Sequence, residues 1–328
     1  HLLNSAGIKC AVAGNIGYAF CRAISALTDE KLIVAEISSY QLHTIRTFRP
    51  RIGLLLNLSP DHLDRYKEAR DYYSAKLRLF DIMGPGDTAI FNADQPETAE
   101  WAGLVGGMQP AWFGFQERPG SLAFSWENIL FIRGKDGRAS EVIGLDKFPL
   151  PGRHNSENLL AAAAAVSALG LKATDIRPGV TTFKGMPHRL EKVIEAEGVT
   201  WVNDSKATTV DSVQRALESY PGPVVLIMGG RHKGAPYKPL AQEVRAKVKR
   251  LILLGEAADL IARDLAGIVP ISRTDSLESA VKAAWTFSSA GDTVLLSPGC
   301  ASFDMFTDFE ERGDKFREAV RKLVSDVS

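Results

Sequence analysis

The chain has 328 residues, of which 45% are hydrophobic and 24% charged, as in ordinary globular proteins, and its length fits about two domains. Lys plus Arg and Asp plus Glu both number 39, so the formal net charge is zero, and no basic excess indicates nucleic acid or an anionic membrane as a partner. The longest apolar stretch, residues 159–171, is too short to span a bilayer. The cysteines, Cys10, Cys21 and Cys300, are widely spaced, which predicts a reducing cytoplasm and no disulfide framework.

The first seven residues read as the tail of a helix stopped by Gly7, and we expect further residues upstream. Short β-rich runs then alternate with helical stretches, which predicts an α/β fold with a mostly parallel sheet. A helix is expected over residues 70–83, ended by the turn at Gly84. The expected strands are 9–13, 32–37, 52–57 and 88–91.

Residues 111–150 follow a different pattern. Short runs separated by Gly and charged turns predict a small antiparallel extension, either a meander or an extra sheet. These runs are 111–115, 122–126, 129–133 and 141–145. An alanine-rich helix to Leu169 comes next and is stopped by Gly170.

A domain boundary is expected near Lys184-Gly185-Met186-Pro187, which gives a first domain of residues 1–185 and a second of 186–328. The second domain begins with a hairpin over 190–195 and 198–203. Three βα steps follow, and together they predict a second doubly wound, Rossmann-like α/β domain. The strands of these steps are 224–228, 251–254 and 293–297.

Ligands of open α/β sheets bind beyond the carboxyl ends of the strands, so residues that follow strands are the candidates for a site. Asn15 follows the first strand in a Gly-Asn-Ile-Gly turn, which either only needs glycine dihedrals or places Asn15 against a substrate. The turn does not match the dinucleotide fingerprint, which argues against a Rossmann dehydrogenase. Glu36 ends the second strand, where a carboxylate suits Mg²⁺. The alternative, which the residues alone favour, is that the next serines form a helix N-cap. His62 lies in a charged loop after the third strand. It is either a site residue or a structural histidine.

Lys76 lies in the middle of an apolar helical stripe. The other members are Tyr72, Ala75, Leu79, Phe80 and Met83. Its stem either covers apolar surface while the ammonium reaches water, or partial burial favours the neutral amine. A neutral amine can react with CO₂ to give a carbamate, an oxygen ligand suited to Mg²⁺ beside His62 and Glu36. Convergence of these side chains would separate a metal site from a metal-free interaction protein.

In the second domain, Asp204 follows a strand, where its carboxylate can bind a ribose hydroxyl while Lys206 lies near phosphates. A helix N-cap at Ser205 or Thr208 is the alternative. The loop 229–234 combines glycines with basic groups, which suits either an anionic ligand or a solvated loop.

The small-residue turn at 297–302 is expected to enter a helix and to offer backbone N–H groups to a carboxylate. Cys300 lies in this turn. It has no evident His/Asn partner arrangement, which argues against a nucleophilic role.

The order and wording of these motifs resemble the Mur ligases, ATP-dependent peptide-bond ligases of bacterial cell-wall synthesis. The resemblance spans essentially the whole chain. Its motifs are EISSYQL (36–42), NLSPDHLDRY (57–66), YSAKLRLF (73–80), NAD (92–94), GRHNSEN (152–158), GMPHR (185–189) and NDSKAT (203–208). The ending SPGCASFDMFTDFEERG (297–313) is most similar to the D-glutamate-adding branch of that family.

The resemblance implies that ATP phosphorylates the C-terminal carboxylate of UDP-N-acetylmuramoyl-L-alanine. The amine of D-glutamate would then attack the acyl phosphate to give the amide, ADP and phosphate. Such phosphoryl transfer depends on positioning and charge neutralisation, and the implied cofactors are ATP and Mg²⁺. The expected protein is a cytoplasmic monomer that binds these small molecules and neither nucleic acid nor membrane.

The resemblance also implies roles for single residues. Lys76 as a carbamate and His62 would serve one Mg²⁺, and Glu36 would serve Mg²⁺ near the nucleotide phosphates. Arg189 would act on ATP in catalysis. The further ATP contacts would be Asn155, Asn158, Asp204 and Lys206. The uridine-nucleotide substrate would be contacted by Asn15, Ser38 and Tyr72. The D-glutamate pocket would be formed by Thr208, Lys233, Ser302, Phe303 and Phe309.

Two departures from the family pattern matter. The phosphate loop G-x-x-G-K-[ST] is expected just before His1 and does not occur in the sequence, and the uridine-binding domain is not present either, so we expect little or no ligase activity from these residues alone. Phe303 replaces a usually smaller aliphatic residue. Two alternatives therefore stay open: another Mur-type amino-acid ligase, and a non-catalytic module that binds nucleotide or amino acid.

Overall fold

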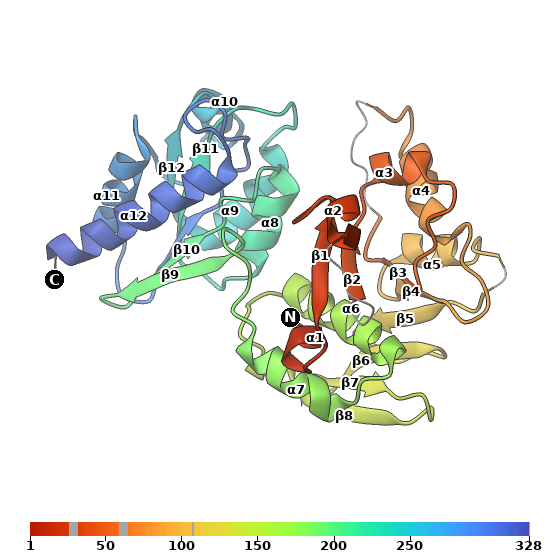
Figure 1. Ribbon diagram of the computed structural model, residues 1–328. Helices are drawn as coiled ribbons and strands as arrows, with labels where there is room; N and C mark the ends of the chain where they lie inside the picture. The colour runs from red at the N-terminus through yellow and green to blue at the C-terminus, as the bar shows by residue number, and fades with distance from the viewer. Residues whose placement is uncertain (26–31, 59–64, 107, 328) are drawn as a thin grey trace. The chain divides into compact units, whose positions relative to one another are not determined.

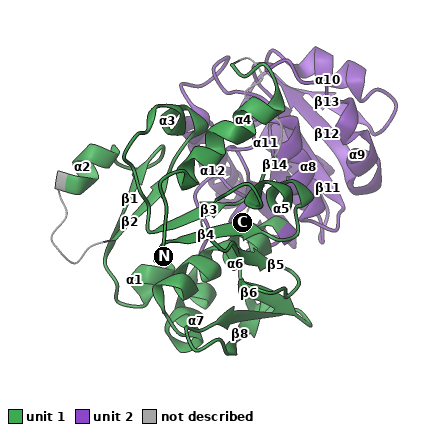
Figure 2. Ribbon diagram, turned by 90° about the vertical axis from the view of Figure 1, so that its right-hand side faces the viewer, with its two compact units in different colours: residues 1–149, 154–183 green, residues 150–153, 184–328 purple. Residues whose placement is uncertain are grey.

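The computed structural model describes residues 1–25, 32–58, 65–106 and 108–327. Two units divide the chain (Figure 2): unit 1 comprises residues 1–149 and 154–183, and unit 2 comprises 150–153 and 184–328. Among the described residues, no helix combines the length and apolar character that crossing a membrane requires.

Unit 1 contains a six-stranded sheet of order β3-β4-β5-β6-β7-β8 and a separate parallel pair, β1 and β2. Strands β3 to β6 pair in parallel, and β7 and β8 extend the same sheet antiparallel. The predicted antiparallel extension is therefore confirmed, but the run at 111–115 belongs to the parallel part as β5. The strands are β1 Cys10–Gly14, β2 Leu32–Glu36, β3 Ile52–Leu55, β4 Thr88–Asn92, β5 Ala111–Gly114, β6 Ser121–Trp126, β7 Ile129–Arg133 and β8 Ala139–Gly144.

The helices of unit 1 include the predicted alanine-rich helix, α6, with Gly170 after it at φ +94°. The helix expected over 70–83 is shorter than predicted, because α4 ends at Leu77 and a 3₁₀ turn takes Arg78–Phe80. The helices are α1 Leu2–Ser5, α2 Phe20–Ser25, α3 Ser39–Thr44, α4 Ala69–Leu77, α5 Pro96–Ala102, α6 Arg153–Leu169 and α7 Ala173–Thr182.

Unit 2 contains a six-stranded sheet of order β13-β12-β11-β14-β10-β9. Strands β9, β10, β11 and β12 of this sheet are labelled in Figure 1. All neighbours pair in parallel except β9 and β10, which form the predicted hairpin. The short strand β13 was not predicted. The strands are β9 Glu191–Ala196, β10 Val199–Asn203, β11 Val224–Gly229, β12 Val248–Leu254, β13 Ile271–Arg273 and β14 Thr293–Leu296.

Helices cover both faces of the unit 2 sheet, as a doubly wound fold requires. Successive residues of β11 point to opposite faces: Leu226 packs in one apolar cluster with residues of α8, α9 and α10, and Ile227 packs in the other with residues of α11 and α12. The predicted fold class is therefore confirmed. The helices are α8 Val210–Glu218, α9 Ala241–Lys247, α10 Ala258–Asp264, α11 Leu277–Phe287 and α12 Phe309–Val327.

Candidate active site

The loops after three strands of unit 2 share one edge of its sheet, because β14 lies between β10 and β11. Backbone hydrogen bonds join these loops directly. The Gly299 N–H donates to the Ala207 carbonyl at 2.8 Å, and Arg231 and Ala301 exchange bonds of 2.8 and 3.1 Å. The structure thus brings together three of the predicted motifs: 203–208, 229–234 and 297–302.

Asp204 lies just beyond the carboxyl end of β10 and is only 7% exposed. Its carboxylate accepts hydrogen bonds from the Leu190 N–H at 3.2 Å and from the Ser297 hydroxyl at 2.9 Å. Burial raises the pKa of Asp204 to about 7, although these two hydrogen bonds and the charge of Arg189 oppose the shift. The predicted ribose ligand therefore also ties the ends of two strands to the loop before β9.

Arg189 is presented by a strained turn. The residues on either side, His188 and Leu190, have φ of 62° and 44°, a left-handed conformation that such residues rarely adopt. Both are buried, whereas Arg189 is exposed. The backbone N–H of His188 donates to Glu191 Oε2 at 2.9 Å, and its ring lies 3.1 Å from Asn203 Nδ2. Buried neighbours thus hold the strained turn and leave the Arg189 guanidinium at the surface.

Lys206 lies over an aromatic ring. Its Nζ is 3.6 Å from the ring centroid of Phe309, a cation–π contact. The preceding Ser205 hydroxyl donates to the Phe309 carbonyl at 2.9 Å. The ring that the resemblance assigns to the D-glutamate pocket therefore holds the lysine assigned to ATP.

Ser302 does not begin a helix, so the prediction of a helix N-terminus at the 297–302 turn is wrong. Ser302 is 3% exposed, and its carbonyl accepts the N–H groups of Met305 and Phe306 at 3.1 and 2.9 Å. The chain continues through turns to α12, where Asp308 accepts the Glu311 N–H at 2.7 Å. Nothing in the local spacing marks this delay.

The other residues assigned to D-glutamate lie on the same loops. Lys233 is exposed and Thr208 half-buried. Phe303 is 61% exposed, an unusual position for a large apolar ring. These side chains leave basic and apolar groups open to a small ligand at this edge.

Cys300 is fully buried, and its Sγ lies 2.9 Å from the Tyr237 hydroxyl. Burial raises the pKa of the thiol to about 11, against the opposing effects of that hydrogen bond and of Arg312 and Lys233. A thiol in this state is protonated at neutral pH and is a poor nucleophile.

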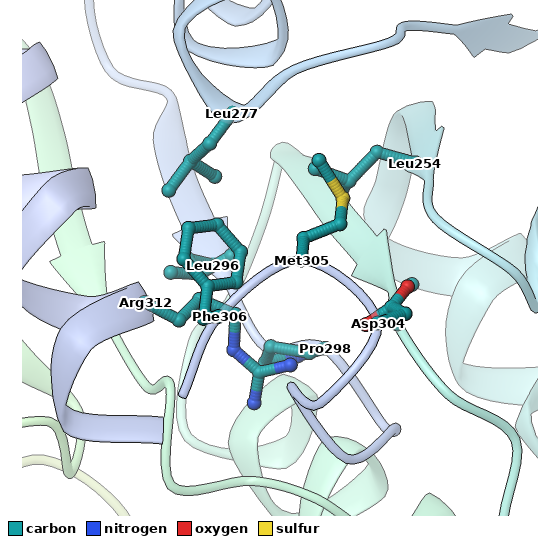
Figure 3. Close-up of a pocket in the computed structure, with 10 residues that line it drawn as sticks. Leu254, Leu277, Leu296, Pro298, Asp304, Met305, Phe306 and Arg312 are labelled. Atoms are coloured by element: carbon teal, nitrogen blue, oxygen red, sulfur yellow. The ribbon is translucent and has the colours of Figure 1, made fainter. Parts of the chain in front are cut away.

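A small cavity of about 10 Å³ is lined by residues of these loops. Figure 3 shows the side chains that line it. Pro298, Asp304 and Arg312 line it together with Gly229, Gly230 and several apolar side chains. This volume is at the lower limit for one water molecule. The cavity is therefore part of the supporting structure and is too small for a substrate.

In unit 1, the parallel pairing of β1 and β2 places Asn15 beside Glu36. The Asn15 side-chain amide donates to Glu36 Oε1 at 3.0 Å, and its backbone N–H donates to the Glu36 carbonyl at 2.7 Å. The Glu36 side chain is exposed. An exposed carboxylate fits the oxygen ligands that Mg²⁺ prefers. Ser38 is the N-cap of α3 and accepts the Gln41 N–H at 3.3 Å, so the capping interpretation is correct for this serine.

Lys76 is half-buried, and its Nζ lies 4.8 Å from the ring centroid of Tyr72, which is buried. His62 lies outside the described residues, so the convergence of Glu36, His62 and Lys76 stays a prediction. Within the described part of the chain, no three His, Cys, Asp or Glu side chains are grouped as metal ligands.

Asn155 and Asn158 occupy the first turns of α6. Their spacing of three residues places them on one face of the helix. Asn158 is exposed and Asn155 half-buried. Both side chains thus lie at the start of a helix whose later turns are buried.

Sequence reasoning gave no role to Arg312, although the D-glutamate-branch motif contains it. Arg312 is 3% exposed. It stands between Phe309 and Phe316 at helical spacing, so a charge within an apolar stripe was a signal that could have marked it.

Comparison with known proteins places the chain in a class. Residues 14–166 match the Mur ligase middle domain, and residues 188–300 match the Mur ligase glutamate ligase domain. The chain belongs to the Mur ligase family.

Two relatives share the name UDP-N-acetylmuramoylalanine–D-glutamate ligase. The one from Pelotomaculum thermopropionicum is 41% identical over 325 residues, covering 98% of this chain and 71% of the relative. The one from Salinibacter ruber is 40% identical, covering 97% of this chain and 70% of the relative.

Solved structures share the fold at low sequence identity. The MurF ligase of Thermotoga maritima in complex with ADP has a TM-score of 0.70 at 17% identity, covering 100% of this chain and 77% of that chain. A pseudomurein peptide ligase type C from Methanothermus fervidus has a TM-score of 0.71 at 18% identity, covering 98% and 74%.

Proposed function

We propose that this chain handles ATP and D-glutamate in an enzyme that ligates D-glutamate to UDP-N-acetylmuramoyl-L-alanine through an acyl phosphate. The observation that carries the proposal is the meeting of three loops at one edge of the unit 2 sheet. These loops bring the nucleotide candidates Asp204 and Lys206 next to the amino-acid candidates Lys233 and Phe303. Relatives about 40% identical carry the name of this ligase.

The basic side chains would do most of the electrostatic work. Arg189 and Lys206 would neutralise phosphate charge, and Asp204 would bind the ribose of ATP. Lys233 would hold a carboxylate of D-glutamate against the two loops that contain Thr208 and Ser302, with the rings of Phe303 and Phe309 beside it. Positioning and charge neutralisation of this kind supply most of the rate of phosphoryl transfer.

The unit 1 residues would bind the uridine-nucleotide substrate, part of ATP, and Mg²⁺. Asn15, Ser38 and Tyr72 would line the reactive end of the uridine-nucleotide substrate, and Asn155 and Asn158 would contact ATP. Glu36, His62 and Lys76 as a carbamate would hold Mg²⁺, which would neutralise charge on the transferred phosphoryl group. A carbonyl signal from ¹³C-bicarbonate that disappears in Lys76→Arg would support the carbamate, and an unchanged signal would exclude it.

The proposal includes a domain boundary between residues 185 and 186, and a monomeric enzyme in the cytoplasm. The two domain matches support this boundary, because the first ends at residue 166 and the second begins at residue 188. Sedimentation velocity of the purified protein measures the oligomeric state directly.

The test is phosphate release by the full-length gene product that carries this chain. The assay contains UDP-N-acetylmuramoyl-L-alanine, ATP and Mg²⁺, with D-glutamate and, as the stereochemical control, L-glutamate. We expect release with D-glutamate and little with L-glutamate. Release with a different amino acid would keep the chemistry but reject the specificity, and no release with any amino acid would favour a binding module.

A further inference from the structure

Arg312 is a buried cation in unit 2 without a carboxylate partner at hydrogen-bond distance among the described residues. It lies in the first turn of α12 and is 3% exposed. Burial lowers the pKa of its guanidinium to about 10, while Asp304 acts on it only through its charge. The side chain nonetheless stays charged at neutral pH.

The guanidinium donates to two of the strand-end loops. Its Nε donates to the Ser205 hydroxyl at 2.9 Å and its Nη2 to the Ser205 carbonyl at 2.8 Å. Its Nη1 donates to the Cys300 carbonyl at 3.2 Å. Ser205 follows β10 and Cys300 follows β14, so one side chain fastens both loops to α12.

Holding the loops with a buried guanidinium costs free energy that a neutral side chain would not cost. A buried charge loses its hydration, and a cation in the first helical turn faces the positive end of the helix dipole. A neutral side chain would fill the same space at lower cost. What the guanidinium adds is a planar set of donors that reaches several acceptors at fixed angles.

The same turns of α12 contact two more elements of the site. The Phe309 ring lies under Lys206, and its carbonyl accepts the Ser205 hydroxyl. Gly313 lies so close to His188 that an added Cβ would come within 2.1 Å of the ring Nδ1. The first residues of α12 therefore contact the turn that carries Arg189 and both strand-end loops.

We propose that Arg312 is a positioning residue: it holds the loop with the nucleotide candidates and the loop with the amino-acid candidates in a fixed arrangement. Through Ser205 it fixes the loop that carries Asp204 and Lys206. Through Cys300 it fixes Ala301, whose backbone bonds to Arg231 hold the loop of Lys233. The role in catalysis rests on the proposed function; the fastening of the two loops does not.

The fastening is tested without any ligand by the alkylation rate of Cys300 with iodoacetamide, followed by peptide mass spectrometry. The exposed Cys21 is the internal reference. The variants are Arg312→Met, which keeps most of the volume, and Arg312→Lys, which keeps the charge. Val320→Ala is the matched control, because Val320 is buried on the same helix within an apolar cluster. Each protein is measured equally far below its own Tm.

We expect Arg312→Met to raise the alkylation rate of Cys300 about tenfold, because the loop loses a charge-assisted hydrogen bond. Arg312→Lys should give an intermediate rate, and Val320→Ala a rate close to that of the unsubstituted protein. An Arg312→Met rate equal to the control rate would overturn the fastening. If Arg312→Met does not fold, the Arg312→Lys rate against the same control decides.

The positioning role is tested by steady-state kinetics of the full-length gene product. We expect Arg312→Lys to raise the KM for ATP and the KM for D-glutamate together, each by about tenfold. A change in only one KM, or in neither, would overturn the shared positioning. If the unsubstituted enzyme does not use D-glutamate, the proposed function fails, and the alkylation rates still decide whether Arg312 fastens the loops.

Discussion

Asp204 gives unit 2 a pH-dependent stability. Its pKa is raised from 3.8 to about 7 by burial, so the native protein binds this proton more tightly than the unfolded chain. The resulting stability is complete below pH 3.8 and is lost as the pH rises through about 7. The slope in this window is at most about 1.4 kcal/mol per pH unit.

Asp204→Asn should remove this component. We expect the free energy of unfolding of the variant, relative to the unsubstituted protein, to increase between pH 5 and pH 8. Urea titrations at each pH measure the difference. Asp211→Asn, at an exposed position on α8, is the control. Parallel curves for Asp204→Asn and the unsubstituted protein would contradict the expectation.

Phe309 should contribute to nucleotide affinity through Lys206 rather than by touching the nucleotide. Phe309→Leu removes the ring under the Lys206 ammonium, and a cation–π contact of this kind is worth about 0.5–1 kcal/mol. We expect the Kd for ATP to rise about twofold to fivefold, which is the factor that corresponds to this energy. Isothermal titration measures the Kd, with Phe309→Tyr as the control that retains the ring. Equal losses in both variants would show that the cation–π contact with Lys206 does not contribute to the affinity.

Gly313 controls how α12 meets the Arg189 turn. Alanine normally stabilises a helix interior relative to glycine by about 1 kcal/mol, but a Cβ here would lie 2.1 Å from His188 Nδ1. Because His188 is buried in a strained conformation, the clash should dominate, and Gly313→Ala should lower Tm by several degrees, the effect of about 1 kcal/mol or more. Gly106→Ala, where a Cβ meets nothing within 4 Å, should leave Tm unchanged. A higher Tm for Gly313→Ala would show that His188 moves freely.

The strands other than β13, and their order along the chain, were predictable because alternating βα patterns and apolar runs are local signals. The end of α4 was not, since Arg78 leaves the helix to donate to the carbonyls of His43 and Ile45 at the end of α3. That contact depends on tertiary structure, and no periodicity encodes it. The late start of α12 has a similar cause: Asp304 in the intervening turns accepts the Glu256 N–H from another loop.

The site was predictable to the extent that motifs follow strand ends. Asp204, Lys206 and Lys233 could be chosen on that basis, and the sheet order explains why their loops meet. The sequence alone could not show that Asp204 is buried with two partners, or that Arg312 joins the loops. The Ser297–Asp204 and Arg312–Ser205 contacts join segments about a hundred residues apart.

At the scale of the whole chain, each unit has apolar clusters of its own among the described residues. The cluster of Phe91 lies within unit 1 and that of Leu226 within unit 2. We therefore expect two calorimetric transitions. Phe91→Ala and Leu226→Ala each remove a fully buried side chain, a loss of about 2–5 kcal/mol, and each should lower a different transition. A single transition lowered by both substitutions would show that the units unfold together.

The position of β14 also constrains how unit 2 is made. Leu295 pairs with Val202 on one side and Leu226 on the other, so the middle of the sheet is filled by a strand that the ribosome produces after all the others. Until then β10 and β11 have no shared partner, and their buried edges stay open to other chains. The nascent unit 2 therefore lacks the central strand of its sheet. It most needs protection from aggregation before residue 296 leaves the ribosome.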